Sequence, residues 1–221
     1  MATVPTPWPS SQEIDRLVSN SSGYFIYART VVKFVDDKNF RPIQRLKDIE
    51  NLTGTGSQTA FEALDELYTQ ILSVVPQHHH LVPILRVLDN FGPALKMSQI
   101  DTLVGLEPGD AALSLRGLHS VLTFFKDRPR FSHASFSDFL RDPSRAGGFY
   151  TDEPARLTEL ARSVLSELSY TYEDSVKNRD WGLIRLYVYH YHEVGRSKFN
   201  NLEQLVEGEL PRTPAYTEWT Q

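Results

Sequence analysis

The stretch Phe131-Ser-His-Ala-Ser-Phe-Ser-Asp-Phe-Leu140 decides the fold, because it predicts a short strand that leads directly into a helix. Its first four residues alternate in the way that suits extended backbone. Ser135 is a favourable N-cap, and Asp138, three residues later, completes a pair similar to a capping box. Pro143 ends the helix soon afterwards. The expected core face of this helix consists of the residues spaced i, i+3 and i+4: Phe136, Phe139 and Leu140.

His133 lies one or two residues before the expected start of that helix. Free backbone N–H groups and the positive end of the helix dipole favour an anion at such a place. The alternative is a partly buried histidine whose ring is satisfied by a backbone carbonyl. The residues alone favour this second interpretation.

Composition predicts a folded, cytoplasmic protein. The chain has 221 residues, of which 40% are hydrophobic and 23% are charged, enough for a folded core. Its net charge of -5 gives no general attraction to nucleic acid or to an anionic membrane. The absence of cysteine excludes disulfides and thiolate metal sites. No apolar run approaches the ~20 residues of a membrane helix, and the first nine residues lack the basic and apolar regions of a signal peptide, so no membrane partner is expected.

Apolar residues recur at helical spacing along most of the chain, which predicts a mainly α fold. Tyr24–Val35 is almost continuously apolar and is expected to be a buried helix, with one edge in solvent at Arg29 and Lys33. A second stripe begins at Phe61 and ends before Pro76, after a capping box at Thr59. The predicted organisation is an extended lead-in, a helical domain, a winged-helix-like domain, a second helical domain and a tail, at residues 1–12, 13–76, 80–146, 150–210 and 211–221.

Residues 80–146 have the order of a winged helix, three helices followed by a β-hairpin. Ser98 and Asp110 are the expected caps of the second and third helices, and Leu113 is expected on the inner face of the third. The expected strands, residues 121–125 and 130–133, flank the turn Lys126-Asp-Arg-Pro129. Residues 141–148 are expected to form a loop. The last helices are expected at residues 152–172, 181–191 and 199–205.

A winged helix often binds DNA, but the charges of residues 82–140 do not favour it here. Six anions balance six cations, and the expected recognition helix offers only Arg116. We therefore expect a packing or regulatory module without nucleic acid as a partner. The alternative is a winged-helix DNA-binding regulator, supported by the basic hairpin residues Lys126, Arg128 and Arg130. A steep salt dependence in a filter-binding titration would favour that alternative.

Three further motifs do not predict a catalytic or metal site. The glycine loop Asn51–Ser57 lacks the Gly-Lys-Ser/Thr ending of a phosphate-binding loop. His78–His80 are consecutive, so their side chains diverge, and they are expected in a solvated loop. His190-Tyr-His-Glu193 lacks a third ligand. No catalytic residue, no metal and no enzymatic activity are expected.

Several segments, taken in order, resemble parts of basidiomycete fungal NACHT proteins, which are STAND-class signalling NTPases related to NOD-like receptors. The resemblance covers roughly residues 8–190. The segments that carry it are Trp8-Pro with Leu17-Val, Ser22–Ala28, Leu64–Leu72, Gly109-Asp with Leu115–Leu122, His133–Pro143, Phe149-Tyr and Leu165–Tyr172. They are similar to the end of the NACHT module, the winged-helix region and the helical domain after it.

The resemblance implies a non-catalytic regulatory segment of a nucleotide-switch protein. The phosphate-binding loop and the Mg²⁺-binding acidic motif of the family are absent, and Met1 falls where the nucleotide-binding core would end, so a truncated product or a fragment is expected. ADP or ATP would then bind only with a NACHT core supplied in cis or in trans, and an oligomeric assembly partner is also implied. In this family a histidine in the context of His133 reaches the terminal phosphate of ADP.

Overall fold

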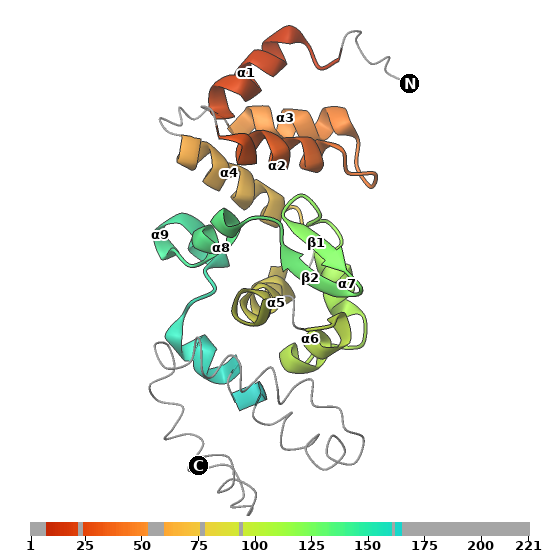
Figure 1. Cartoon of the computed structure of the whole chain (residues 1–221), viewed down its shortest axis with the longest axis vertical. Helices are drawn as coiled ribbons and strands as arrows, with labels where there is room; N and C mark the ends of the chain where they lie inside the picture. The colour runs from red at the N-terminus through yellow and green to blue at the C-terminus, as the bar shows by residue number, and fades with distance from the viewer. Residues whose placement is uncertain are drawn as a thin grey trace, which may run out of the picture. The chain divides into compact units, whose positions relative to one another are not determined.

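The computed structural model describes residues 8–21, 24–52, 60–75, 78–92, 95–160 and 162–164. This part of the chain is mainly helical and contains one two-stranded antiparallel sheet, which confirms the predicted fold class (Figure 1). The chain divides into two compact units, residues 1–154 and 155–221, and the elements below belong to the first unless stated otherwise. Among the described helices, none combines the length and the apolar character needed to cross a membrane.

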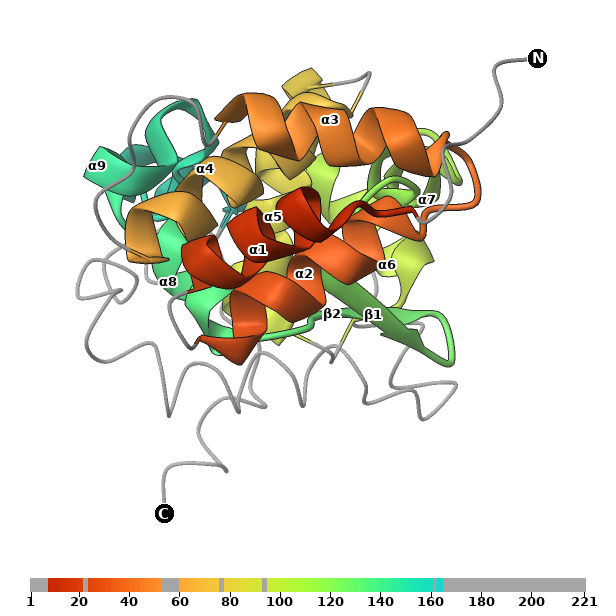
Figure 2. The same ribbon diagram turned by 90° about the horizontal axis from the view of Figure 1, so that it is seen from above.

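Four helices form the N-terminal part of the first unit. They are α1 (Ser11–Ser21), α2 (Phe25–Val35), α3 (Pro42–Leu52) and α4 (Ala60–Ser73). Both α1 and α3 pack against α2 and α4, and α2 also packs against α4. Figure 2 shows α1 and α2 side by side, with α3 along the same side of the unit.

The helix predicted at Tyr24–Val35 has an exposed edge, as expected, but this edge also carries apolar residues that were expected to be buried. Tyr27, Val31 and Phe34 are buried, whereas Phe25 is 88% exposed and Val32 is 65% exposed. The reason is that α2 meets its neighbours with one face only, so the apolar residues on its other face remain in solvent.

The stripe of α4 is buried as expected except at its first member. Its buried residues are Leu64, Tyr68, Ile71, Leu72 and Val75. Phe61 is 55% exposed, because it lies in the first turn, where its ring packs on the similarly exposed Tyr24 at 5.0 Å between centroids. The expected cap Thr59 lies outside the described residues.

Three helices and a hairpin follow in the predicted order. They are α5 (His78–Phe91), α6 (Met97–Val104), α7 (Asp110–Leu115), β1 (Leu122–Phe125) and β2 (Arg128–Phe131). The histidines at 78–80 form the first turn of α5, so the expectation of a loop there is wrong. Polar residues suit this position, because the N–H groups of a first turn have no partner within the helix.

The expected caps of α6 and α7 are also wrong. The N-cap of α6 is Lys96, whose N–H donates to the side chain of Gln99 at 2.9 Å. The N-cap of α7 is Gly109, at φ 99°. The buried carboxylate of Asp101 instead accepts the N–H groups of Gly109 and Ala111, both at 2.8 Å, and so satisfies the start of α7 from another helix.

The buried residues of α7 are Ala111, Ser114 and Leu115, so Leu113 lies on its outer side and is exposed, contrary to expectation.

The hairpin turns more tightly than expected. Lys126 and Asp127 form a two-residue turn with positive φ at both positions, and Arg128 and Pro129 belong to β2 rather than to the turn. Such turns match the twist of the paired strands. In an antiparallel ladder, hydrogen-bonded pairs alternate with pairs that form no hydrogen bond. Phe125 and Arg128 close the turn, so the next pair, Phe124 and Pro129, is one without hydrogen bonds, and proline is tolerated there. The carbonyl of Asp127 accepts the N–H of Met97 at 3.1 Å, which fastens the turn to α6.

Three short helical elements follow the hairpin. They are α8 (Ala134–Leu140), α9 (Pro143–Ala146) and the 3₁₀ turn η3 (Gly147–Phe149), so the expected loop at 141–148 is wrong. Asp142 caps α9 by accepting the N–H of Ser144 at 2.9 Å, and Pro143 occupies the first helical position, which it suits. Residues 154–160 and 162–164 are helical as expected.

In the second unit, the described buried residues are Leu157, Leu160 and Val164. The rest of the helix expected at 152–172, and the helices expected at 181–191 and 199–205, lie outside the described residues.

The Phe136, Phe139 and Leu140 face of α8 is buried, as the sequence predicts. Both phenylalanine rings pack against Tyr68 of α4, with centroids 4.9 and 5.4 Å from the tyrosine ring. The ring of Phe131, at the end of β2, lies 5.2 Å from that of Phe136. This aromatic cluster joins α4, β2 and α8 in one core.

Replacing Phe139 with alanine is expected to lower the free energy of unfolding by about 3–5 kcal/mol, because the ring is fully buried and its loss leaves a cavity. Phe125→Ala is the matched control, since this ring is 60% exposed and its loss should change stability by no more than about 0.5 kcal/mol. Urea denaturation of the three proteins measures both effects. Equal stability of Phe139→Ala and the unsubstituted chain would contradict the description of this core.

Candidate functional site

The start of α8 is organised by His133. Its backbone is extended, at φ -155° and ψ 147°, and its Nδ1 accepts the N–H of Ser135 at 3.1 Å. His133 is therefore the N-cap, and the prediction that Ser135 caps the helix is wrong. An imidazole nitrogen on an extended residue reaches the second N–H of a helix as a shorter polar side chain does.

The capping pair predicted between Ser135 and Asp138 does not apply to this helix. With the cap at His133, the partner position of a capping box is Phe136, and Asp138 lies two residues beyond it. Asp138 is exposed on the outer side of α8. The predicted cap at Ser135 and the predicted capping pair with Asp138 fail for the same reason, because the helix begins before Ser135.

A chain of hydrogen bonds connects His133 to the core. The hydroxyl of Ser135 lies 2.8 Å from His133 Nδ1 and 2.9 Å from the hydroxyl of Tyr68. Burial raises the pKa of Tyr68, and the negative charges of Asp65 and Asp138 add to that rise. Tyr68 thus remains protonated and can donate to Ser135, whose own hydroxyl then donates to Nδ1.

These bonds assign the tautomer of His133. Because Nδ1 accepts the N–H of Ser135, the proton of the neutral ring resides on Nε2. The side chain is exposed, and within the described residues no hydrogen bond to Nε2 is formed. The interpretation that the sequence favoured, a partly buried ring bonded to a backbone carbonyl, is therefore wrong. The ring presents a fixed Nε2–H donor to solvent.

An ion pair lies beside this chain, between α9 and α4. The guanidinium of Arg145 binds both carboxylate oxygens of Asp65, at 2.7 and 2.8 Å. The hydrogen bonds to Asp65 are the main reason why the pKa of Arg145 is raised above its ordinary value. Two parallel bonds of this kind fix orientation as well as distance, so α9 is held against α4 next to Tyr68.

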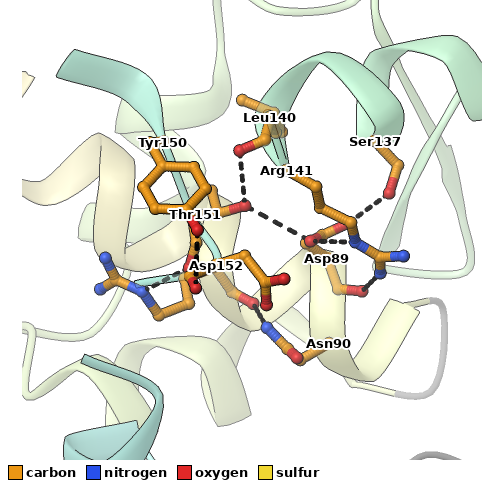
Figure 3. Close-up of polar contacts among 9 residues, drawn as sticks. Asp89, Asn90, Ser137, Leu140, Arg141, Tyr150, Thr151 and Asp152 are labelled. Carbon is orange, nitrogen blue, oxygen red and sulfur yellow. Dashed lines mark hydrogen bonds and ion pairs between the residues drawn. The ribbon is translucent and has the colours of Figure 1, made fainter. Parts of the chain in front are cut away.

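A third set of polar contacts is centred on Asp89 of α5, whose side chain is 1% exposed (Figure 3). Its carboxylate accepts Arg141 Nε at 2.8 Å, the hydroxyl of Ser137, and the hydroxyl of Thr151 at 3.3 Å. Arg141 Nη2 also donates to the backbone carbonyl of Asp89 at 3.0 Å. One carboxylate thus holds the middle and the end of α8 as well as the segment after η3.

Thr151 continues this set towards the end of the first unit. It is fully buried, and its N–H donates to the carbonyl of Leu140 at 2.9 Å. Its own carbonyl accepts Arg86 Nε at 2.9 Å (Figure 3). The backbone around Thr151 is therefore bonded both to α8 and to α5.

The sequence analysis selected His133 but did not place Tyr68 and Asp89 among the bonding partners of the helix that His133 begins. These residues are 48 to 67 positions from their partners along the chain, as the bonds from Ser137 to Asp89 and from Tyr68 to Ser135 show. Local spacing carries no signal for such contacts. The one available signal is a charged residue directly after a buried apolar residue, as at Asp89 after Leu88 and Arg141 after Leu140.

The contact between Ser135 and His133 has the distance of a nucleophile and its base. However, Nδ1 has a single lone pair, which the hydroxyl shares with the backbone N–H of the same serine, and the serine oxygen is also bonded to Tyr68. Both groups are thus engaged in capping α8. Within the described residues, no group of three or more histidine and carboxylate side chains could hold a metal ion.

Comparisons with protein-family models, with curated proteins and with solved structures find no match to this chain.

Replacing Asp89 with alanine is expected to lower the free energy of unfolding by about 1–3 kcal/mol, because it leaves the hydroxyl of Ser137 without its acceptor and removes the carboxylate that accepts Arg141 Nε. Asp138→Ala removes an exposed carboxylate from the same region and should have an effect within about 0.5 kcal/mol. Thermal and urea unfolding compare the two. A larger loss for Asp138→Ala would show that Asp138, rather than Asp89, organises α8.

Tyr68→Phe is expected to reduce the sensitivity of the fold to alkali. The pKa of Tyr68 is raised above its ordinary value of 10.0, so its stabilising contribution is complete below that value and is lost as the pH rises through the folded-state pKa. Phenylalanine lacks this contribution. Unfolding free energies measured from pH 8 to about pH 11 should fall less steeply for the variant than for the unsubstituted chain. Identical slopes would contradict a buried, protonated Tyr68.

Proposed function

We propose that this chain is the regulatory arm, without catalytic activity of its own, of a STAND-type nucleotide-switch protein. Its partner would be a NACHT nucleotide-binding core, present in cis or in trans, and its site would be cytoplasmic. The proposal is supported by the resemblance of the ordered segments between residues 8 and 190. The observation that carries it is the Nε2–H donor of His133, held outward at the start of α8.

A donor of this kind suits a phosphate oxygen. Because the ring is fixed through Nδ1, little further ordering is needed when Nε2–H meets its acceptor. A hydrogen bond to a charged phosphate contributes about 1.5–3 kcal/mol. If that bond forms only in the closed state, ADP would shift the balance between closed and open states by about ten- to a hundredfold.

The bonding around α8 provides a route from such a contact to the rest of the first unit. His133 is joined through Ser135 to Tyr68 of α4, and α8 is joined to α5 through Asp89. A phosphate that holds His133 would consequently also hold two helices that pack in the core. An oligomeric assembly partner would engage surfaces that become accessible when this hold is released.

The chain is proposed to bind ADP or ATP only together with a core, and not to hydrolyse ATP alone. The sequence contains no Gly-Lys-Ser/Thr motif, which positions the transferred phosphate in P-loop enzymes. Purified residues 1–221 are expected to show no turnover of ATP above a blank.

The second candidate, a winged-helix DNA-binding regulator, has one supporting observation, the cations of the hairpin turn and β2. The helix that would enter the major groove is α7, which has six residues and an acidic first residue, Asp110. Recognition helices present basic and polar residues along a longer face. The nucleotide-switch proposal is therefore the better supported of the two.

The test joins residues 1–221 to a related NACHT core and compares three forms at position 133. His133→Ala removes both the cap and the donor, whereas His133→Ser keeps a favourable cap and removes only the Nε2–H group. We expect both to weaken ADP binding by about ten- to a hundredfold. Only His133→Ala should also lower thermal stability. His79→Ala, at an exposed histidine of α5, should leave ADP affinity unchanged. Unchanged affinity in His133→Ser would contradict the proposal.

A further inference from the structure

The outward face of α2 carries large apolar side chains in solvent. Phe25 is 88% exposed and Val32 is 65% exposed, and because they are seven residues apart they lie on the same side of the helix, two turns from one another. Arg29, also exposed, lies between them. The opposite side of α2 is buried in the core.

The elements packed against α2 carry further exposed apolar side chains. Val18 of α1 is 64% exposed, and Tyr24 and Phe61, whose rings are in contact at a tilted angle, are about half exposed, at 48% and 55%. The three helices concerned, α1, α2 and α4, pack against one another (Figure 2). We call these five residues, Val18, Tyr24, Phe25, Val32 and Phe61, the α1–α2 face. Scattered exposed hydrophobics are ordinary, but a group on packed elements is typical of an interaction surface.

The charges on α2 indicate the charge of a partner that would bind this surface. Arg29 and Lys33 are four residues apart, a spacing at which like charges destabilise a helix. Burial lowers the pKa of Lys33, and the positive charge of Arg29 lowers it further. Within the described part of the chain, neither side chain forms an ion pair with a carboxylate. Acidic side chains of a partner would neutralise both.

A second copy of this chain does not fit the face well. In a two-fold antiparallel pairing of α2, Phe25 would meet the equivalent of Val32, and Arg29 would come close to its own equivalent near the axis. The contact would thus concentrate positive charge at its centre.

An anionic membrane fits no better. Membrane attraction of this kind relies on clusters of about 4–8 cations, whereas α2 offers two, followed by the exposed Asp36 at its C-cap.

We propose that the α1–α2 face docks an amphipathic helix of a partner protein, with apolar residues at helical spacing and aspartate or glutamate on the flanks. The apolar side of that helix would cover Phe25 and Val32, and its carboxylates would pair with Arg29 and Lys33. This inference goes beyond the proposed nucleotide switch and does not depend on it.

The test uses the full chain and two synthetic helical peptides as probes. Both carry leucines at i, i+3, i+4 and i+7, and they differ only in having glutamate or lysine on the flanks. The unsubstituted chain is expected to bind the glutamate peptide about tenfold more tightly than the lysine peptide. The charge-reversed variant Arg29→Glu/Lys33→Glu should reverse that preference, and Phe25→Ser/Val32→Ser should bind neither peptide while melting at an unchanged temperature. Phe124→Ser/Phe125→Ser, at exposed residues of the hairpin, should bind as the unsubstituted chain does.

The proposal is overturned if the glutamate peptide does not bind at about 1 mM, the weak end of specific affinities, or if charge reversal leaves the preference unchanged. Sedimentation with phosphatidylserine vesicles that is lost in Phe25→Ser/Val32→Ser would assign the face to a membrane and would also overturn it. So would a dimer of the unsubstituted chain that this same variant abolishes.

Discussion

The burial of one face of α8 against Tyr68 is the interaction on which the rest of the first unit depends. Phe136, Phe139 and Leu140 are each almost completely removed from solvent. Burying side chains of this size contributes about 1.5–3 kcal/mol each, which is a large part of the stability of a typical domain. The same cluster includes Phe131 at the end of the hairpin, so it connects elements that are distant in the sequence.

Burial alone does not determine how α8 is rotated or where it begins, because the hydrophobic effect has no direction. The polar bonds around the helix supply this information. The Tyr68–Ser135–His133 chain fixes its first turn, and the carboxylate of Asp89 fixes its middle and end. This combination places His133 at the surface with a defined orientation and connects it through Ser135 to the buried Tyr68. When a ligand binds a side chain held in this way, the bonds behind that side chain couple the ligand to α4 and α5, and the proposed nucleotide switch requires such coupling.

The sequence predicted the elements that follow from local periodicity. The stripes of α4 and α8 and the order of three helices and a hairpin all depend on spacing within one segment. The caps were mispredicted, because Asp101 satisfies the start of α7 from another helix and His133 replaced the serine that usually takes this role. The exposure of Phe25 could not be foreseen either, since the apolar character of a residue does not say which neighbours will cover it. In the site, His133 was recognisable from its position before a helix, whereas its partners come from distant segments.

The central claim is that His133 is held by its own helix through Nδ1 and therefore carries its proton on Nε2. Long-range ¹H–¹⁵N correlation spectra of the imidazole, recorded on the full chain with His133→Ser for assignment, measure this tautomer directly. The account predicts that, in the neutral form of the ring, Nδ1 is the acceptor and Nε2 carries the proton. A neutral ring protonated on Nδ1 would contradict it, because the N–H of Ser135 would then have no acceptor there and no Nε2–H donor would face the solvent.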